Sequence, residues 1–301
     1  MRTTYKTERR NSNSLWIFYW NLGDYLRTVS FTVTNGASNE KKTYSNIKIF
    51  RTTSSEMVTP CVRTNGNTQT LSDMNPNGIS GKAVIAKTNA APLGGGNSFY
   101  GIYYVAGQLY ISGYATSTAG IPTLPANTYP AFCLKKDGSV NIRWFKDGND
   151  VAKALIHCRC IIGAAHPLVY KGLSVLEDDI VYDEYTDRRI ADWNNLTNPN
   201  YHFNDDICDS QAKIERPRTM FGYNPVQDKY YLVCTNSGMN LRVGAKLMHD
   251  LGCEFAVNMD GGSATQMRVA SGYTNGAAAG RVTSVAPDSY LYGTAICVHK
   301  K

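Results

Sequence analysis

The chain has 301 residues, of which 43% are hydrophobic and 18% charged, so it can bury a sizeable core and is not disordered as a whole. Its formal net charge of +7 comes from dispersed basic residues, which excludes the clustered basic stripe of a nucleic-acid-binding protein. The 20 tyrosines and 26 glycines favour strands and turns over long helices.

Residues 1–45 are basic and contain two short strand-like stretches, and we interpret them as an N-terminal extension to a domain over residues 46–301. The apolar patch from Leu15 to Trp20 is too short for a secretory segment. No run approaches the roughly 20 apolar residues of a membrane span. We therefore expect a protein without a membrane span that is cytoplasmic or virion-associated.

Strand patterns recur from residue 46 onward. Two hairpins are predicted, one turning at Ala106-Gly107 and one at Asp137-Gly138. A buried strand is predicted over residues 154–163, and residues 183–215 are polar and irregular, as in a long surface excursion. Glycines 94–96 lack a following helix, which favours a flexible loop over a dinucleotide-binding turn.

The last third predicts a strand, a helix and a strand in succession. The helix begins at the N-cap Asn240 and ends at Gly252, and the next strand, CEFAVNMDGG, ends at Asp260. A closing strand lies in SYLYGTAICVHK. Together with the preceding hairpins, this order predicts an α+β fold: a mixed, strand-rich sheet domain with few helices.

The eight cysteines are dispersed, and we expect them to be reduced. Cys158 and Cys160 follow His157 in HCRC, which is an incomplete zinc signature. We interpret the pair as alternate residues of a buried strand, and no metal site is predicted from it.

The segment NMDGGSATQ carries the strongest functional signal. A strand that ends in Asp260 presents a carboxylate at the edge of a sheet. Gly261 and Gly262 would let a ligand approach the backbone and would point N–H groups at an anion, while Ser263 and Thr265 add hydroxyl groups. An Asp-Gly hairpin turn is the alternative, but the residues that follow do not mirror the preceding strand.

Three further residues are candidates. Arg218, after Pro217, offers a planar fork suited to carboxylate or phosphate, or else is a solvated surface residue. Asn89 ends the strand AVIAKTN. His166 stands at a strand end before a proline, a position where a single histidine is more often structural than catalytic.

These segments resemble the phosphodiester glycosidase family. The resemblance runs from about residue 216 to 299, through RPRTMFGYN, KYYLVCTN, SGMNLRVGAKLMHDLG and NMDGGSATQM. Upstream, AVIAKTNAAP and HPLVYKG are similar to two weaker motifs of the family. After Asn89 the chain has Ala-Ala-Pro where the family has aromatic residues, which leaves the identity of the sugar open.

The resemblance implies a glycoside hydrolase that cleaves the sugar–phosphate bond of a sugar-1-phosphodiester with an N-acetylglucosamine-like sugar. It implies no cofactor, although a divalent cation at Asp260 is compatible with it. The implied catalytic residues are Asp260, Arg218 and Asn89. The implied substrate- or phosphate-binding residues are Gly261, Gly262, Ser263, Thr265, Thr219, His166 and Arg281.

Two other classes of function stay open at this point. One is a non-catalytic module for glycan binding or virion assembly. The other is a phosphodiesterase acting on a sugar nucleotide or a signalling nucleotide. The reaction product separates them, because only a glycosidase releases free sugar and a phosphomonoester.

Overall fold

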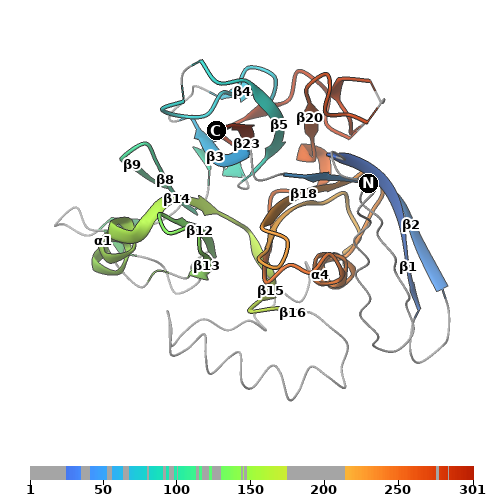
Figure 1. Cartoon of the computed structure of the whole chain (residues 1–301), viewed down its shortest axis with the longest axis horizontal. Helices are drawn as coiled ribbons and strands as arrows, with labels where there is room; N and C mark the ends of the chain where they lie inside the picture. The colour runs from blue at the N-terminus through green and yellow to red at the C-terminus, as the bar shows by residue number, and fades with distance from the viewer. Residues whose placement is uncertain are drawn as a thin grey trace, which may run out of the picture.

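The structure is a computed structural model that describes 25–34, 41–52, 56–63, 68–79, 81–90, 93–94, 98–99, 101–112, 115–116, 122–123, 130–143, 145, 148–174, 214–275, 278–283 and 285–301. Three antiparallel sheets make up most of this part, with two α-helices at their outer sides (Figure 1). The expected surface excursion over residues 183–215 lies outside the described residues except for its last two positions. Of glycines 94–96, only Gly94 is described.

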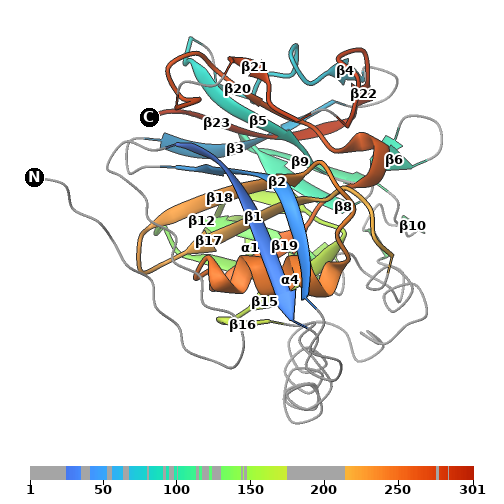
Figure 2. The same ribbon diagram turned by 90° about the vertical axis from the view of Figure 1, so that its right-hand side faces the viewer.

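The largest sheet has seven strands in the order β1-β2-β18-β17-β19-β15-β16. Its strands are β1 (Leu26–Thr34), β2 (Lys41–Arg51), β15 (His166–Tyr170), β16 (Leu173–Ser174), β17 (Thr219–Asn224), β18 (Lys229–Thr235) and β19 (Phe255–Asn258). Helix α4 (Leu241–Asp250) connects β18 to β19 and packs against β15, β16 and β19 (Figure 2). Asn240 caps this helix by accepting a hydrogen bond from the Val243 N–H at 2.9 Å, as the sequence predicts.

A second sheet has the order β21-β20-β5-β23-β3. Its strands are β3 (Glu56–Val62), β5 (Val84–Asn89), β20 (Met267–Val269), β21 (Gly280–Arg281) and β23 (Thr294–Lys300). The expected closing strand is therefore β23, and it lies between β3 and β5. Three small two-stranded sheets complete the description: β4 (Gln69–Thr70) with β22 (Leu291–Tyr292), β6 (Leu93–Gly94) with β7 (Ser98–Phe99), and β10 (Ala115–Thr116) with β11 (Pro122–Thr123).

The third sheet contains both predicted hairpins. Its order is β13-β12-β14-β8-β9, with β8 (Gly101–Val105), β9 (Gln108–Ser112), β12 (Ala131–Lys135), β13 (Val140–Arg143) and β14 (Cys158–Gly163). Helix α1 (Gly148–His157) packs on β14. The predicted strand over 154–163 is thus correct from Cys158 onward and wrong before it, because 154–157 form the last turn of α1.

Buried side chains from the three sheets form one main core. The rings of Phe132 in β12 and Phe221 in β17 meet edge to face with centroids 4.7 Å apart. Ile296 of β23 belongs to the same cluster. Burial of this apolar surface is the main favourable contribution to folding.

The expected domain boundary does not follow the strands. Residue 45 lies inside β2, which pairs with β1 on one side and with β18 on the other. The described residues before 46 therefore belong to the seven-stranded sheet rather than to an extension. The reason is physical: β2 is one continuous strand, and it covers the edge of β18.

The α+β, strand-rich class with few helices is confirmed. Every strand pair among the described residues is antiparallel, although the strand-helix-strand pattern suggested a mixed sheet. The difference arises because β17 lies between β18 and β19, so the two strands joined by α4 are not neighbours. No described helix has the length and apolar character needed to cross a membrane.

Seven cysteines are described, and all seven are free and buried. Cys158 and Cys160 alternate along β14 and face different clusters of buried side chains. They therefore do not point at a common ion, which agrees with the interpretation as alternate residues of a buried strand.

Candidate active site

The candidate site lies where the second sheet meets the seven-stranded sheet. Asn89 ends β5 and Thr219 begins β17, and both are buried. The Thr219 hydroxyl donates to Asn89 Oδ1 at 2.8 Å, and the Gln266 N–H donates to the same oxygen at 3.0 Å. One amide side chain therefore ties the two sheets together.

The same strand end fixes Asp260. The Asp260 N–H donates to the Ala90 carbonyl at 2.7 Å, and the Asp260 carbonyl accepts from Asn89 Nδ2 at 2.8 Å. The carboxylate is partly exposed, and its Oδ1 accepts from the Gly261 N–H at 2.9 Å. A hydrogen bond from a backbone N–H favours the ionised form of a carboxylate. Asp260 thus presents a positioned carboxylate at the junction of the two sheets.

Asn89 is anchored by its amide. Its amide oxygen accepts two hydrogen bonds, its amide nitrogen donates to the Asp260 carbonyl, and the residue is 1% exposed. These contacts hold Asp260 in position. The catalytic role that the resemblance implied for Asn89 stays a prediction.

The two glycines do not form the open anion-binding turn expected from the sequence. The Gly261 N–H donates to the Asp260 side chain, and the Gly262 N–H donates to the Pro217 carbonyl at 2.8 Å. A Cβ at Gly261 would lie 2.7 Å from that carbonyl oxygen, and Gly262 has a φ of +61°. Packing and backbone conformation therefore require these glycines, and their N–H groups are engaged internally.

Arg218 lies against the segment that carries Asp260. Its Cδ is 3.6 Å from the position that a Cβ of Gly261 would take. The guanidinium is buried, and it donates from Nε to the Met239 carbonyl at 2.9 Å and from Nη2 to the Ile214 carbonyl at 2.6 Å. Burial, followed by repulsion from Arg216, lowers its pKa to about 10, so it keeps its charge at neutral pH.

His166 and Asn258 add polar groups beside this charge. They are register partners on β15 and β19, and Asn258 precedes Asp260 by two residues. His166 Nδ1 and Asn258 Oδ1 are both buried without a hydrogen-bond partner in the described part of the chain. Burial, then the charges of Arg218 and Arg216, lowers the pKa of His166 to about 4, so the imidazole is neutral at physiological pH.

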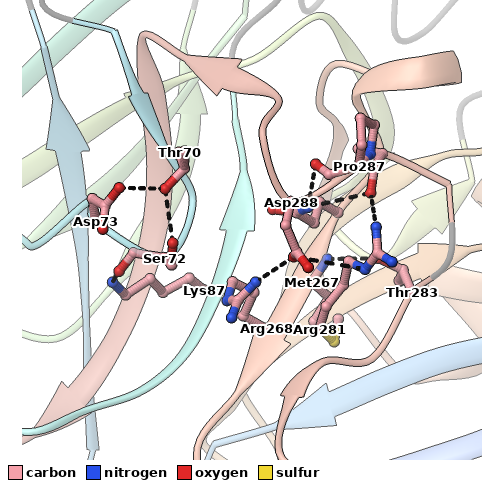
Figure 3. Close-up of polar contacts among 12 residues, drawn as sticks. Thr70, Ser72, Asp73, Lys87, Met267, Arg268, Arg281, Thr283, Pro287 and Asp288 are labelled. Atoms are coloured by element: carbon pink, nitrogen blue, oxygen red, sulfur yellow. Dashed lines mark hydrogen bonds and ion pairs between the residues drawn. The ribbon is translucent and has the colours of Figure 1, made fainter.

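The remaining predicted residues are placed differently. Ser263 is exposed on the short 3₁₀ helix η1 (Gly262–Ala264), whereas Thr265 is fully buried. Arg281 lies on β21 and donates to the Ala286 carbonyl at 2.5 Å. Figure 3 shows Arg268 and Arg281 both directed at Asp288, with N–O distances of 2.6 and 3.7 Å. Arg281 is therefore engaged with Asp288 rather than with Asp260.

Three residues of the site were not singled out from the sequence: Asn258, Gln266 and Arg216. Asn258 could have been found, because it stands two positions before Asp260 and is the last residue of β19. Gln266 and Arg216 carried no such signal, since their places depend on contacts between strands far apart in sequence.

No group of three or more His, Cys, Asp and Glu side chains gathers as a metal site within the described ranges. A divalent cation at Asp260 consequently stays a prediction. The arrangement itself offers a carboxylate, a buried guanidinium and neutral hydrogen-bonding groups.

The phosphodiester glycosidase family model matches residues 79–298, which include every site residue described above. The chain belongs to the phosphodiester glycosidase family. A search of curated proteins finds no match.

Solved structures show the same fold at low sequence identity. The catalytic domain of zebrafish N-acetylglucosamine-1-phosphodiester alpha-N-acetylglucosaminidase, auto-inhibited by its pro-peptide, is 14% identical with a TM-score of 0.60. That match covers 100% of this chain and 88% of the zebrafish domain. A hypothetical protein from Synechocystis is 11% identical with a TM-score of 0.51, over 92% of this chain and 62% of that one.

Proposed function

We propose that this protein hydrolyses the glycosidic bond between a sugar and the phosphate of a sugar-1-phosphodiester, with an N-acetylglucosamine-like sugar. The observation that carries the proposal is that Arg218 lies beside Gly261, where the Gly262 N–H bonds to the Pro217 carbonyl at 2.8 Å and so joins the two segments. A carboxylate and a cation at one site match the two charges that this reaction has to stabilise.

The chemistry explains why few groups are needed. A phosphate monoester is a stable leaving group, so the departing oxygen needs little help from a general acid. The sugar develops oxocarbenium character as the bond breaks, and a fixed carboxylate stabilises that positive charge. Asp260 would face the anomeric carbon, and its anchoring by Asn89 and Ala90 supports that role.

The field of the two arginines supports binding of the phosphate. Arg218 and Arg216 both lower the pKa of His166, so their positive charge is felt at this place in the site. A phosphate is attracted by the same field, and a guanidinium matches its geometry. This assigns Arg218 to phosphate binding, with Arg216 adding to the charge.

Neutral groups would bind the sugar. His166 Nδ1 and Asn258 Oδ1 are buried polar atoms without partners in the described residues, and such atoms are unfavourable unless a ligand satisfies them. A sugar hydroxyl both donates and accepts a hydrogen bond. His166 therefore serves as a neutral sugar-binding group in this proposal, rather than as the phosphate ligand implied by the resemblance.

The test uses UDP-N-acetylglucosamine, which is itself a sugar phosphodiester, with free sugar as the readout. Asp260→Asn should lower turnover at least about 100-fold while leaving the melting temperature unchanged, because the amide keeps the shape but loses the charge. Asp288→Asn is the matched control, since Asp288 is an exposed carboxylate that pairs with arginines away from Asp260.

The products decide between reaction classes. Free sugar and a nucleoside diphosphate support the glycosidase, whereas sugar-1-phosphate and a nucleoside monophosphate would show cleavage of the P–O bond. Equal turnover in the wild type and Asp260→Asn would refute the assignment of Asp260. Glycan binding without turnover of any sugar phosphodiester would refute the enzymatic proposal.

A further inference from the structure

A cavity of about 360 Å³ lies between α1 and the third sheet, apart from the Asp260 site. Its lining includes the side chains of two cysteines, Cys133 of β12 and Cys158 of β14. These strands are hydrogen-bonded neighbours, with Cys133 opposite Ile161 and Cys158 opposite Lys135. The two cysteines therefore lie diagonally across adjacent strands on the wall of one cavity, through which a small reagent could reach them.

The cavity is also rich in positive charge. Lys135 and Arg143 line it, and Lys136 lies close by, donating to the Ile156 carbonyl at 2.8 Å. Two acids are near but engaged: Asp150 pairs with Arg143 at 2.5 Å, and Asp137 accepts hydrogen bonds from the backbone and hydroxyl of Ser139. Lys135, Lys136 and Arg143 against these two acids leave an excess of one positive charge, which favours a small molecule that carries negative charge.

The environment distinguishes the two thiols. The neighbouring Cys133 thiol lowers the pKa of the Cys158 thiol, against the opposing effect of burial. Three basic side chains act in the same direction, in the order Arg143, Lys135 and Lys136. They offset the carboxyl end of α1, which ends at His157 and disfavours a thiolate. Cys133, by contrast, has its pKa raised by its interaction with Cys158 and by burial.

We propose that Cys158 is a reactive thiol that undergoes exchange with small anionic disulfides entering this cavity, and that Cys133 resolves the product. The Cys158 thiolate attacks one sulfur of the small disulfide, forming a mixed disulfide and releasing one small thiolate. Cys133 then loses its proton and attacks Cys158 Sγ, forming the Cys133–Cys158 disulfide and releasing the second small thiolate. The protein dithiol is oxidised, and the small disulfide is reduced to two thiols.

A second thiol pair shows why the cavity matters. Cys61 and Cys297 also interact with each other, and Arg63 and Lys87 are close to them. Both of these cysteines are 0% exposed and pack in an apolar cluster. Their chemistry resembles that of the first pair, but burial protects them. Cys158, at 3% exposure on the wall of a cavity, is the accessible member of the two pairs.

The test measures thiol release from native protein with dithiobis(nitrobenzoate), an aromatic disulfide that carries two carboxylates. Cys208 lies outside the described residues, so all proteins carry Cys208→Ser. The parent should release two thiol equivalents in a fast phase and keep no label. Cys133→Ser should release one and keep the label on Cys158, and Cys158→Ser should lose the fast phase, slowing release by roughly tenfold or more.

Cys160→Ser is the matched control, because Cys160 lies on the same strand but faces the main core. It should behave like the parent. Peptide mapping of the oxidised parent needs no variant and should find Cys133 linked to Cys158. Added salt should slow the anionic reagent but not the neutral dithiodipyridine, because screening weakens only the charge attraction.

Several results would overturn the proposal. A fast phase that survives Cys158→Ser would place the reactive thiol elsewhere. Absence of any fast phase in the folded parent would show that the cavity does not admit the reagent. A disulfide between other cysteines would remove the resolving role of Cys133, and equal salt dependence for both reagents would remove the preference for anions.

Discussion

The Asp260 site and the Cys133–Cys158 cavity are built in different ways. At the Asp260 site, strand ends from two sheets meet and backbone groups fix the reactive side chain, through the Asp260 N–H and carbonyl. In the cavity, the thiols project from adjacent strands and side chains set their environment. The comparison teaches that a site fixed by the backbone leaves a compact sequence motif, whereas one fixed by strand pairing does not.

The two regions also differ in how buried polarity is satisfied. Around Asp260, most polar atoms bond within the protein, but several buried ones have no partner among the described residues, including His166 Nδ1, Asn258 Oδ1, Thr265 Oγ1 and Gln266 Oε1. In the cavity, the Cys133 thiol donates only a long hydrogen bond of 3.8 Å to the Ala131 carbonyl, and Cys158 lies on the neighbouring strand. A ligand would therefore complete hydrogen bonds in the first region and change covalent bonds in the second. Substitutions around Asp260 test whether this hydrogen-bonded region is rigid.

The largest effect is expected from removing the amide that joins the sheets. Asn89→Ala leaves the Thr219 hydroxyl, the Gln266 N–H and the Asp260 carbonyl without their partner. Each buried polar group left unpaired costs about 1–3 kcal/mol, so the free energy of unfolding should fall by about 3 kcal/mol or more. Turnover should fall as well, because Asp260 loses an anchor.

The control for this variant is Thr88→Val. Thr88 precedes Asn89 and is equally buried, but its hydroxyl has no hydrogen-bond partner among the described residues. Replacing it with a methyl group should leave stability unchanged or raise it slightly. Urea unfolding of both variants checks the pair. A similar loss in both would mean that burial at this strand end, rather than the amide contacts, determines stability.

The next effect is a dependence of stability on pH. Burial and two arginines lower the pKa of His166 from 6.5 to about 4, so below pH 6.5 the unfolded chain binds a proton that the folded protein does not. The free energy of unfolding should therefore decrease as pH falls from 6.5 to 4, by about 3 kcal/mol. Urea unfolding at several pH values measures this slope.

His166→Gln separates this contribution from those of other groups. The pKa of His299 is also lowered by burial, but His299 is present in both proteins and its effect cancels in the difference. The variant should show a shallower slope over the same pH range. Identical slopes would mean that His166 is not held neutral beside the arginines.

A smaller effect is expected at the two glycines. Gly261→Ala should cost about 2 kcal/mol, because the new Cβ would lie 2.7 Å from the Pro217 carbonyl oxygen. Gly262→Ala should cost about 1 kcal/mol, since φ is +61° and the new Cβ would meet only Arg216 Cδ, at an ordinary contact distance of 3.9 Å. Gly262→Ala should also keep its affinity for a phosphodiester, because its N–H already bonds to Pro217. A loss of affinity at unchanged structure would support the original interpretation of these glycines as an open anion-binding turn.

Prediction from the sequence succeeded where the signal was local. The cap at Asn240 and both hairpin turns follow from neighbouring residues, as does the strand before Asp260, although β19 ends at Asn258 rather than at Asp260 as predicted. It was wrong where the outcome depended on distant partners. β2 runs through the boundary expected at residue 45, because it pairs with β1 and with β18. Residues 154–157, expected to be strand, belong to the helix over 148–157, which is stabilised by packing on β14.

The candidate site follows the same rule. Asp260 and Arg218 were identified from motifs, and Arg218 lies beside Gly261, the residue after Asp260. Their roles in a reaction stay predictions. The positioning role of Asn89 could not be predicted, because it requires knowing that Thr219 and Gln266 donate to one oxygen. The placement of Arg281 could not be predicted either, since its partner Asp288 belongs to a different loop.

The smallest effect is expected at Arg281. It tests whether the substrate site extends from Asp260 as far as Arg281 on β21. Arg281 pairs with Asp288, whose side chain is 64% exposed, and exposed ion pairs contribute about 0–1 kcal/mol. Arg281→Lys should therefore leave turnover of a sugar phosphodiester and the melting temperature nearly unchanged. Arg218→Lys should raise KM, because an ammonium cannot keep both bonds, to the Met239 and Ile214 carbonyls, that hold the positive charge in place. Comparing kcat and KM of the two variants checks this, and a rise in KM for Arg281→Lys equal to that for Arg218→Lys would extend the substrate site to β21.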